Sequence, residues 1–327
     1  METNYKKIMI WKNVTEKRRN DLLTNSDKFK DVKLIIKGSL NLEGYRSLTS
    51  LPDGLKVVGS LILARCTSLT SLPDGLQVGY HLNLEGCTNL TSLPDGLKVE
   101  GNLSLEGCTS LTSLPDGLKV GGLLGLSLVG CTSLTSLPDG LQVGGCLILS
   151  ECTNLISLPD GLQVGYLDLS GCSSLTTLPD GLQVGSLFLS NCINLTSLPD
   201  GLKVEGDLSL DGCTNLTSLP VGLKVEGDLS LEGCTNLTSL LDGLKVEGNL
   251  WLRGCTNLTS LPDGLKVEGN LSLEGCTNLT SLPNGLKVEG GLDLANTPLV
   301  KYTDGELLKM IGSNGYINKG IKRKWRG

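Results

Sequence analysis

Leucines recur at fixed spacings along most of this chain and divide it into units with nearly the same hydrophobic pattern. Residues 256–276, TNLTSLPDGLKVEGNLSLEGC, show one unit, of about 21 residues, and thirteen such units fill residues 31–299. Apolar and polar residues alternate from Val204 to Leu210 of one unit, which predicts a half-buried β-strand. A Leu-Pro pair and an Asp-Gly turn complete most units, and no stretch within a unit has the length or period of an α-helix.

A unit this short cannot bury its apolar face alone, so consecutive units must stack as the rungs of a solenoid. Equivalent strands, one per rung, then form a parallel β-sheet on one face, with about 4.8 Å between neighbours. The Leu-Pro segments return along the other face in an extended, polyproline-like conformation. The unit that leads to Cys131 is longer than the rest, and those that lead to Cys172 and Cys192 are shorter. We interpret the long unit as a bulge and the short ones as local kinks.

The two ends of a stack would expose apolar edges, so we expect short helical caps at both. Residues 15–23 predict a short helix with Thr15 or Asn13 at its start. At the other end Thr303 and Glu306 predict a capping box, and Gly312 predicts the end of that helix. These signals divide the chain into an N-terminal cap, 1–30, a repeat array, 31–299, and a C-terminal helical cap with a basic tail, 300–327.

Cysteine placement indicates a structural role for the thiols. Eleven of the twelve cysteines occupy one repeat position and predict a buried column of small apolar side chains. Parallel side-chain directions disfavour disulfides between rungs, so we expect reduced thiols and a reducing compartment. Cys146 is the one cysteine off the column, and we expect it to be exposed.

Charge is distributed unevenly along the chain. Residues 38–297 hold 11 Lys and Arg against 27 Asp and Glu, whereas each flank carries a net charge of +5. An acidic array repels phosphates, so we expect no nucleic acid along it. No apolar run approaches the length that spans a membrane, and the patch Ile8–Trp11 is too short for a signal peptide. We therefore expect a cytoplasmic protein, or one delivered into a host cytoplasm without a cleaved signal.

The unit pattern VxGxLxLxxCxxLxxLPxxL resembles the leucine-rich repeat family. Its strand core, Leu208-x-Leu210-x-x-Cys213, is similar to the family's LxLxxN/C, although Val and Gly stand at the strand start where the family has Leu. The run 169–175, LSGCSSL, resembles plant disease-resistance receptors, and the Leu-Pro return resembles the repeats of secreted bacterial effectors. The resemblance implies a leucine-rich repeat solenoid whose strand face binds proteins. Some such effectors carry a ubiquitin-ligase domain with a catalytic Cys, but neither flank of this array contains a Cys.

Departures from the repeat on the outward strand face are the candidates for partner binding. Small polar residues dominate this face, so apolar and aromatic residues there indicate an interface, or neutral drift in a duplicated array. The candidates are Ile62, Ile148, Tyr166, Asp168, Phe188, Trp251 and Arg253. We expect the four from Ile148 to Phe188 to form one amphipathic patch, and we expect a basic or amphipathic protein or peptide as the partner.

Two other functions are open, and enzymatic chemistry has little support. Threonines form two columns, one of them Thr214, Thr235, Thr256 and Thr277 and the other Thr217, Thr238, Thr259 and Thr280. Such columns could match ice or a polymer, although Ser173, Ile193 and Ile156 interrupt them. An architectural spacer is the other alternative. His81 is the single histidine and has no nucleophile motif around it, so we expect no catalytic residue, no metal and no cofactor.

Overall fold

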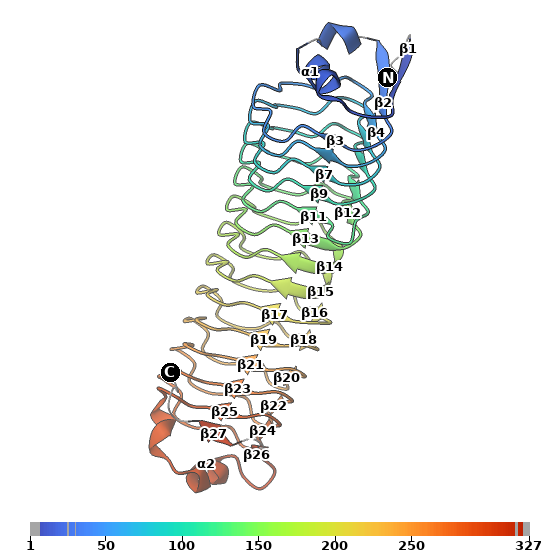
Figure 1. The fold of residues 1–327 in the computed structure, drawn as a ribbon. Helices are drawn as coiled ribbons and strands as arrows, with labels where there is room; N and C mark the ends of the chain where they lie inside the picture. Colours follow the sequence, from blue (N-terminus) through green and yellow to red (C-terminus); the bar gives the residue numbers. More distant parts are fainter. Residues whose placement is uncertain (1–6, 25, 30, 318–319, 323–327) are drawn as a thin grey trace. The chain divides into compact units, whose positions relative to one another are not determined.

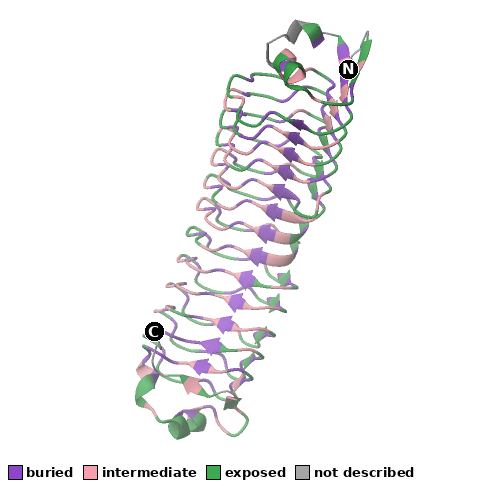
Figure 2. Ribbon diagram, viewed as in Figure 1, coloured by how far each residue is buried: buried purple, intermediate pink, exposed green. Residues whose placement is uncertain are grey.

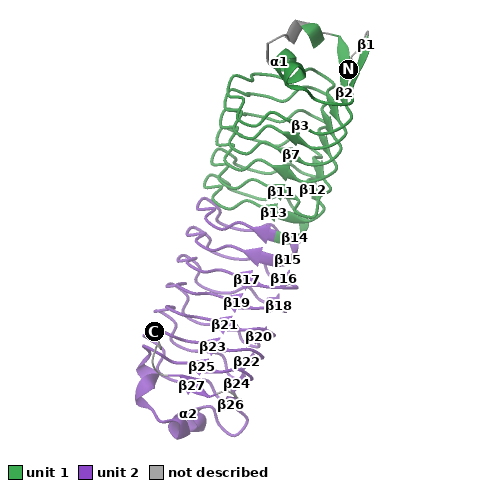
Figure 3. Cartoon of the chain, viewed as in Figure 1, with its two compact units in different colours: residues 1–166 green, residues 167–327 purple. Residues whose placement is uncertain are grey.

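The computed structural model describes residues 7–24, 26–29, 31–317 and 320–322 (Figure 1). The chain divides into two compact units, residues 1–166 and 167–327 (Figure 3). Each unit is a parallel β-solenoid in which one repeat makes one turn, as the sequence predicts. Helices are few and lie near the two ends of the chain (Figure 1).

Each regular rung carries two short strands, so the prediction of one strand per rung was wrong. In one rung these are β16 (Lys203–Val204) and β17 (Leu208–Ser209), and the three residues between them turn a corner. Val204 and Leu208, on either side of this corner, are both buried. A Cβ on the equivalent Gly227 would lie 2.6 Å from the carbonyl carbon of Gly206, and this close approach of the neighbouring backbone explains the glycine at the corner.

The first unit has two parallel sheets. One contains β1 (Lys7–Trp11), β2 (Val32–Ile36), β4 (Lys56–Val57), β6 (Gln77–Val78), β8 (Lys98–Val99), β10 (Lys119–Val120) and β12 (Gln142–Val143) in this order. The other contains β3 (Leu40–Asn41), β5 (Leu61–Ile62), β7 (Leu82–Asn83), β9 (Leu103–Ser104), β11 (Leu126–Ser127) and β13 (Cys146–Ile148). β14 (Gln163–Asp168) contains the division between the units.

The second unit repeats this arrangement. β15 (Gln183–Phe188) pairs with both β16 and β17. From β16 one sheet continues through β18 (Lys224–Val225), β20 (Lys245–Val246), β22 (Lys266–Val267), β24 (Lys287–Val288) and β26 (Tyr316–Ile317). From β17 the other continues through β19 (Leu229–Ser230), β21 (Leu250–Trp251), β23 (Leu271–Ser272), β25 (Leu292–Asp293) and β27 (Ile321–Lys322).

Repeats of unusual length change the corner between the two strands. In the short repeats one residue is missing there, and the two strands join into the continuous β14 and β15. We predicted local kinks, and the structure instead has continuous strands. The long repeat adds Leu123 and Leu124, which protrude with 87% and 69% of their surface exposed. Gly125 closes this protrusion with φ +63° and donates its N–H to the Gly122 carbonyl at 2.9 Å.

The core consists of stacked leucines, valines and cysteines (Figure 2). All eleven column cysteines are buried and free, as predicted. Their Sγ atoms donate to the carbonyl of a leucine on the preceding rung, for example Cys87 to Leu63 at 3.2 Å and Cys234 to Leu210 at 3.1 Å. Burial raises the pKa of Cys87, among others, to about 12, because a buried thiolate would lose its hydration.

The N-terminal segment covers the first rung with a strand and a helix. β1 is the apolar patch to which the sequence assigned no structure, and it pairs in parallel with β2. α1 (Glu16–Thr24) directly follows Thr15, whose Oγ1 accepts the Arg18 N–H at 3.4 Å, and η1 (Ser26–Phe29) comes next. Trp11 and Phe29 are buried with ring centroids 5.9 Å apart, so this segment has a small core of its own.

The C-terminal segment closes the second unit. η2 (Pro298–Lys301) precedes α2 (Asp304–Met310), which has the predicted capping box between Thr303 and Glu306. Gly312 follows with φ +72°, as expected at the end of a helix. Ile311 is buried, and its carbonyl accepts the Gly285 N–H of the last repeat at 2.6 Å. The expected basic tail lies mostly outside the described residues, but its start, Ile321–Lys322, forms β27.

Candidate functional site

The outward face of the sheet that contains β17–β27 carries the most distinctive surface of the second unit. Its strands pair in register, so the residues between the two inward leucines form one column across the rungs. The column is Ser209, Ser230, Trp251, Ser272 and Asp293, followed by Lys322 on β27. Trp251 therefore stands between two serines, which leaves space on both sides of its indole ring.

A hollow of about 720 Å³ surrounds Trp251, and we call it the Trp251 hollow. Its lining comes from three consecutive rungs and from the C-terminal segment: Trp251, Asn270, Ser272, Asp293, Asp304, Ile321 and Lys322 are among its residues. Trp251 is half-buried, so part of the ring faces the hollow. The hollow thus combines an aromatic wall with two carboxylates, Asp293 and Asp304, and one ammonium group, that of Lys322.

The C-terminal segment supplies one wall of the Trp251 hollow. Ile321 and Lys322 pair with Leu292 and Asp293, which extends the sheet by one strand beyond the repeats. Lys322 Nζ lies 2.9 Å from Asp293 Oδ2 and holds that carboxylate in place. Sequence reasoning missed this wall because two residues after a glycine carry no recognisable strand pattern. The register with Leu292 and Asp293 appears only once the chain is folded.

Acidic side chains dominate the next outward column of the same strands. Asp211 accepts the Glu232 N–H at 2.8 Å and the Ser230 hydroxyl, and Arg253 Nε lies 3.6 Å from Glu274 Oε2. Burial, followed by the negative charges of Asp211 and Glu274, raises the pKa of Glu232, while Arg253 opposes the shift. A positive group bound near Glu232 would relieve this repulsion.

The structure places the remaining predicted residues on the same kind of face. Phe188 is half-buried on β15 and pairs with Ser209, so two serines separate it from Trp251. Asp168 accepts the Ser170 N–H at 2.9 Å, a local bond that Asp293 repeats with Ala295. This bond gives Asp168 a structural role in its turn.

In the first unit the predicted residues are also half-buried and face outward. Ile62 on β5 pairs with Asn41 on one side and Asn83 on the other. Ile148 on β13 pairs with Ser127, and the strands β7, β9 and β11 separate it from Ile62. Tyr166 ends this unit on β14. The expected patch from Ile148 to Phe188 has members in both units, and it stays a prediction.

Residues with possible chemical roles have structural ones instead. His81 Nδ1 accepts the Asn102 N–H at 3.0 Å, so the imidazole links two rungs at the corner. Aspartates and asparagines make the same bond in other rungs, for example Asp207 with the Asp228 N–H at 2.9 Å. Cys146 is half-buried rather than fully exposed. Within the part of the chain that the structure describes, no group of three or more His, Cys, Asp and Glu side chains is placed to hold a metal ion.

The threonine column that contains Thr238 and Thr259 has a structural role as well. Thr259 donates its hydroxyl to the Thr238 carbonyl of the preceding rung at 3.3 Å, and Thr91 does the same to Thr70. Ile156 and Ile193 interrupt the two columns with exposed side chains. Recognition of ice or of a polymer therefore gains no support from the column geometry.

No protein-family model matches the chain, and no curated protein matches it. Among solved structures it is similar to the crystal structure of a leucine-rich repeat protein from Bacteroides ovatus ATCC 8483. The identity is 17%, the TM-score is 0.39, and the match covers 90% of this chain and 82% of that chain. None of the described helices has the length and hydrophobicity needed to cross a membrane. The repeats and stacked parallel strands of the chain itself make it a parallel β-solenoid.

Proposed function

We propose that this protein is a non-enzymatic scaffold that binds a partner protein through the outward face of the sheet containing β17–β27. The partner presents a basic or amphipathic segment. The single observation that carries the proposal is the Trp251 hollow, in which a half-buried tryptophan stands between serines near Asp293 and Asp304. Tryptophan is enriched among residues that dominate binding energy, and a concave surface lets a partner side chain contact it fully.

Charge supports a basic segment. The array carries far more acidic than basic residues, and the column beside Trp251 holds Asp211, Glu232 and Glu274. Complementary charge raises association rates and excludes acidic partners. Free, buried cysteines suit a reducing compartment, so we place the scaffold in a cytoplasm.

Selection from a random peptide display library tests the proposal. We expect enrichment of peptides in which Lys or Arg lies near an aliphatic or aromatic residue. Their binding should protect Trp251 from an added fluorescence quencher and weaken as salt increases, because exposed charges are screened.

Two variants locate the binding surface. Trp251→Ala should weaken the selected peptides by about tenfold or more, as expected for a hot-spot aromatic. Tyr80→Ala removes an exposed aromatic from a corner of the other unit and should leave affinity unchanged. Equal binding by the wild type and Trp251→Ala would show that the proposed surface is not the interface.

A further inference from the structure

The strand β1 lies at the outer edge of its sheet and has one open side (Figure 1). It pairs in parallel with β2 over all five residues, and no other described strand lies along its opposite side. Edge strands in proteins are usually very short, or carry prolines or bulges that prevent further pairing. β26 and β27 have two residues each, whereas β1 has five and contains no proline. Its open edge is therefore able to accept another strand.

The hydrogen-bonding groups of this open edge belong to Ile8 and Ile10. The Trp11 carbonyl accepts the Lys37 N–H at 2.9 Å, so Trp11 directs its backbone groups toward β2. Successive residues of a strand direct these groups to opposite sides. Met9 therefore faces β2 as Trp11 does, while Ile8 and Ile10 face away from it. These two residues present two N–H groups and two carbonyls to a further strand.

The same two isoleucines carry exposed apolar side chains. Ile8 and Ile10 are 62% and 52% exposed, whereas Trp11 is buried and Met9 is half-buried on the other face of the strand. Ile35 on β2 pairs with Ile10 and extends the apolar face by one strand. Main-chain groups at a sheet edge together with alternate apolar side chains are the features by which sheets bind extended peptides.

Lysines stand at both ends of the open edge. Lys7 is the first residue of β1 and Lys12 follows its last residue, and both are exposed. Residues 1–37 carry a net charge of +5, and Asp31 precedes β2, on the side of β1 away from the open edge. The charge along the edge is thus positive. A second copy of the chain would bring the lysines of both copies together in either strand direction, which disfavours it.

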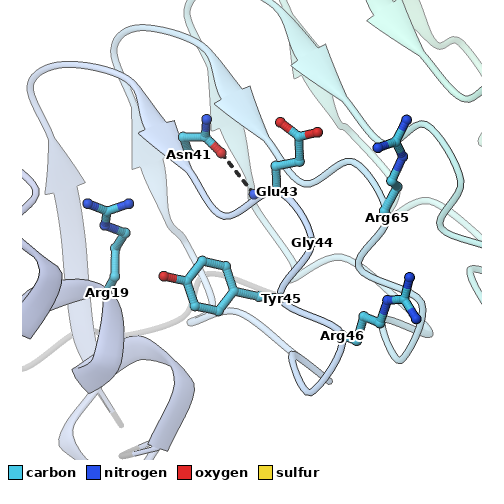
Figure 4. Close-up of a pocket in the computed structure, with 7 residues that line it drawn as sticks. All are labelled: Arg19, Asn41, Glu43, Gly44, Tyr45, Arg46 and Arg65. Carbon is cyan, nitrogen blue, oxygen red and sulfur yellow. Dashed lines mark hydrogen bonds between the residues drawn. The ribbon is translucent and has the colours of Figure 1, made fainter.

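A hollow at the same end of the first unit offers no comparable site. It has a volume of about 540 Å³, and its lining includes Arg19 from α1 with Glu43, Arg46 and Arg65 from the first rungs (Figure 4). The three guanidinium groups do not converge in Figure 4, and Glu43 lies among them. Arg65 also lies 4.0 Å from Glu85. No single ligand position is therefore surrounded by these arginines.

We propose that the open edge of β1 binds an extended, acidic segment of a partner protein as an additional strand. In the antiparallel direction, the partner residues opposite Ile8 and Ile10 exchange both main-chain hydrogen bonds with them. Apolar side chains of these partner residues pack on the two isoleucines, and carboxylates at the ends of the segment approach Lys7 and Lys12. The surface is in the first unit, is independent of the Trp251 hollow and prefers the opposite charge.

Fluorescence anisotropy of a labelled peptide, titrated with the full chain, tests the proposal. The probe is Glu-Thr-Val-Thr-Val-Glu, whose valines align with Ile10 and Ile8. We expect saturable binding that weakens as salt increases, because exposed charges are screened. Lys-Thr-Val-Thr-Val-Lys and the rearranged peptide Glu-Glu-Val-Val-Thr-Thr should each bind about tenfold more weakly or less. Equal binding of all three peptides, or no binding of the probe, would overturn the proposal.

N-methylated peptides test the strand geometry. Methyl groups on the two valine amides remove the N–H groups that face β1, and they should weaken binding by about tenfold or more. Methyl groups on the two threonine amides, which face away from β1, should have a much smaller effect. An equal loss with both peptides would show that the segment does not bind as an added strand.

Charge changes on the protein locate the site. Lys12→Glu should weaken binding of the acidic probe severalfold. Lys17→Glu is the matched control, because it makes the same change on α1, within the same flank, and it should have little effect. The combination of Lys7→Glu and Lys12→Glu should bind the lysine peptide more tightly than the wild type does, a gain that loss of folding cannot produce. Equal effects of Lys12→Glu and Lys17→Glu would overturn the assignment to this edge.

Two further measurements separate this surface from the alternatives. Ile10→Thr removes an apolar contact but keeps a β-branched residue in the strand, so it should weaken the acidic probe severalfold. Trp251→Ala should leave that affinity unchanged, which distinguishes this edge from the Trp251 hollow. Sedimentation of the full chain without peptide should show no dimer that depends on β1. A dimer that Ile10→Thr abolishes would identify a second copy as the occupant and overturn the assignment to an acidic partner.

Discussion

At the scale of single residues, the residue directly before each column cysteine has the clearest conformational requirement. This position has a left-handed backbone in the rungs described, and glycine, which adopts it without strain, fills most of them. Arg65, Glu151, Asn191 and Asn296 hold it with φ between 58° and 62°. Asn tolerates this region better than Arg or Glu, so the strain differs between these four rungs.

Glu151→Gly should stabilise the protein. The change removes the strain of a left-handed conformation, which costs about 1–2 kcal/mol for a residue with a Cβ. Up to about 1 kcal/mol of this gain is offset because glycine has more conformational freedom in the unfolded chain. Denaturant unfolding should therefore show a gain of no more than about 1.5 kcal/mol. Asn191→Gly serves as the comparison and should change stability less. A loss of stability in Glu151→Gly would contradict this account.

Thiol labelling should distinguish Cys146 from the column. Cys146 is half-buried, whereas the other eleven cysteines are buried and those with raised pKa values hold few thiolates at neutral pH. We expect a thiol reagent to modify one cysteine in the native protein and all twelve in denaturant, counted by mass spectrometry. Cys146→Ser should abolish the native reaction. Rapid modification of several column thiols in the native state would contradict the structure.

At the scale of elements, the corner between the two strands of a rung absorbs changes in repeat length. Regular repeats bend there, the short ones straighten into β14 and β15, and the long one protrudes. Stacking continues through all three kinds because the inward Val and Leu keep their register, as Val120 does with Val143 and Leu126 with Leu147. The corner is therefore the site of length variation in this solenoid.

Deletion of Leu123 and Leu124 tests this interpretation. The deletion restores the regular repeat length and removes two largely exposed apolar side chains from the surface. We expect stability within about 1 kcal/mol of the wild type, because neither residue contributes to the core. Light scattering should show less self-association, since exposed apolar patches promote aggregation. Unfolding of the deletion variant would show that the protrusion is a required part of the fold.

At the scale of the whole molecule, the buried thiols make stability depend on pH. Burial raises the pKa of many column cysteines to about 12, among them Cys108, Cys213 and Cys255. Ionisation is easier in the unfolded chain, where a thiol has a pKa of about 8.5. The stability from keeping these thiols neutral is thus complete below pH of about 8.5 and is lost as pH rises toward about 12.

We therefore expect a steep loss of stability as pH rises from about 9 to about 11. Each thiol that ionises only on unfolding lowers the free energy of unfolding by about 1.4 kcal/mol per pH unit. Several such thiols together make the slope correspondingly steeper, and denaturant titration at several pH values measures it. Replacing Cys213, Cys234 and Cys255 by Ala should lower this slope by about three times the contribution of a single thiol. An unchanged slope would show that other groups cause the alkaline unfolding.

The sequence predicted the stack well because one unit repeats with little change. Leu208, Leu210 and Cys213 occupy buried positions that recur in rung after rung. A wrong structural assignment in one unit can therefore be corrected by comparison with the next. The capping box at Thr303 was visible for a similar reason, since its signal is local in the sequence. The division of each rung into two strands was not visible. Val204 and Leu208 belong to one alternating run in the sequence, and nothing in that run marks the corner between β16 and β17.

The candidate sites were only partly predictable. Trp251 departs from the repeat and can be recognised by comparing units. Ile321 beside it and the edge strand β1 cannot be recognised, because they lie in the flanks, where no repeat gives a reference. Whether a residue that differs from the repeat is neutral drift or part of a binding site depends on which residues of the flanking segments lie beside it.

The sequence by itself determined the period, the inward leucines and cysteines, and the parallel stacking, since so short a unit buries its apolar side chains only against its neighbours. The tertiary structure alone decided how the two ends close. β1 and β27 add strands, and the segments that carry them bring Arg19 and Lys322 to the rungs. The physical reason is the kind of contact. Stacking follows from contacts between successive repeats, which share one sequence pattern. Each hollow instead depends on a contact between a repeat and a flanking segment whose sequence does not follow the repeat.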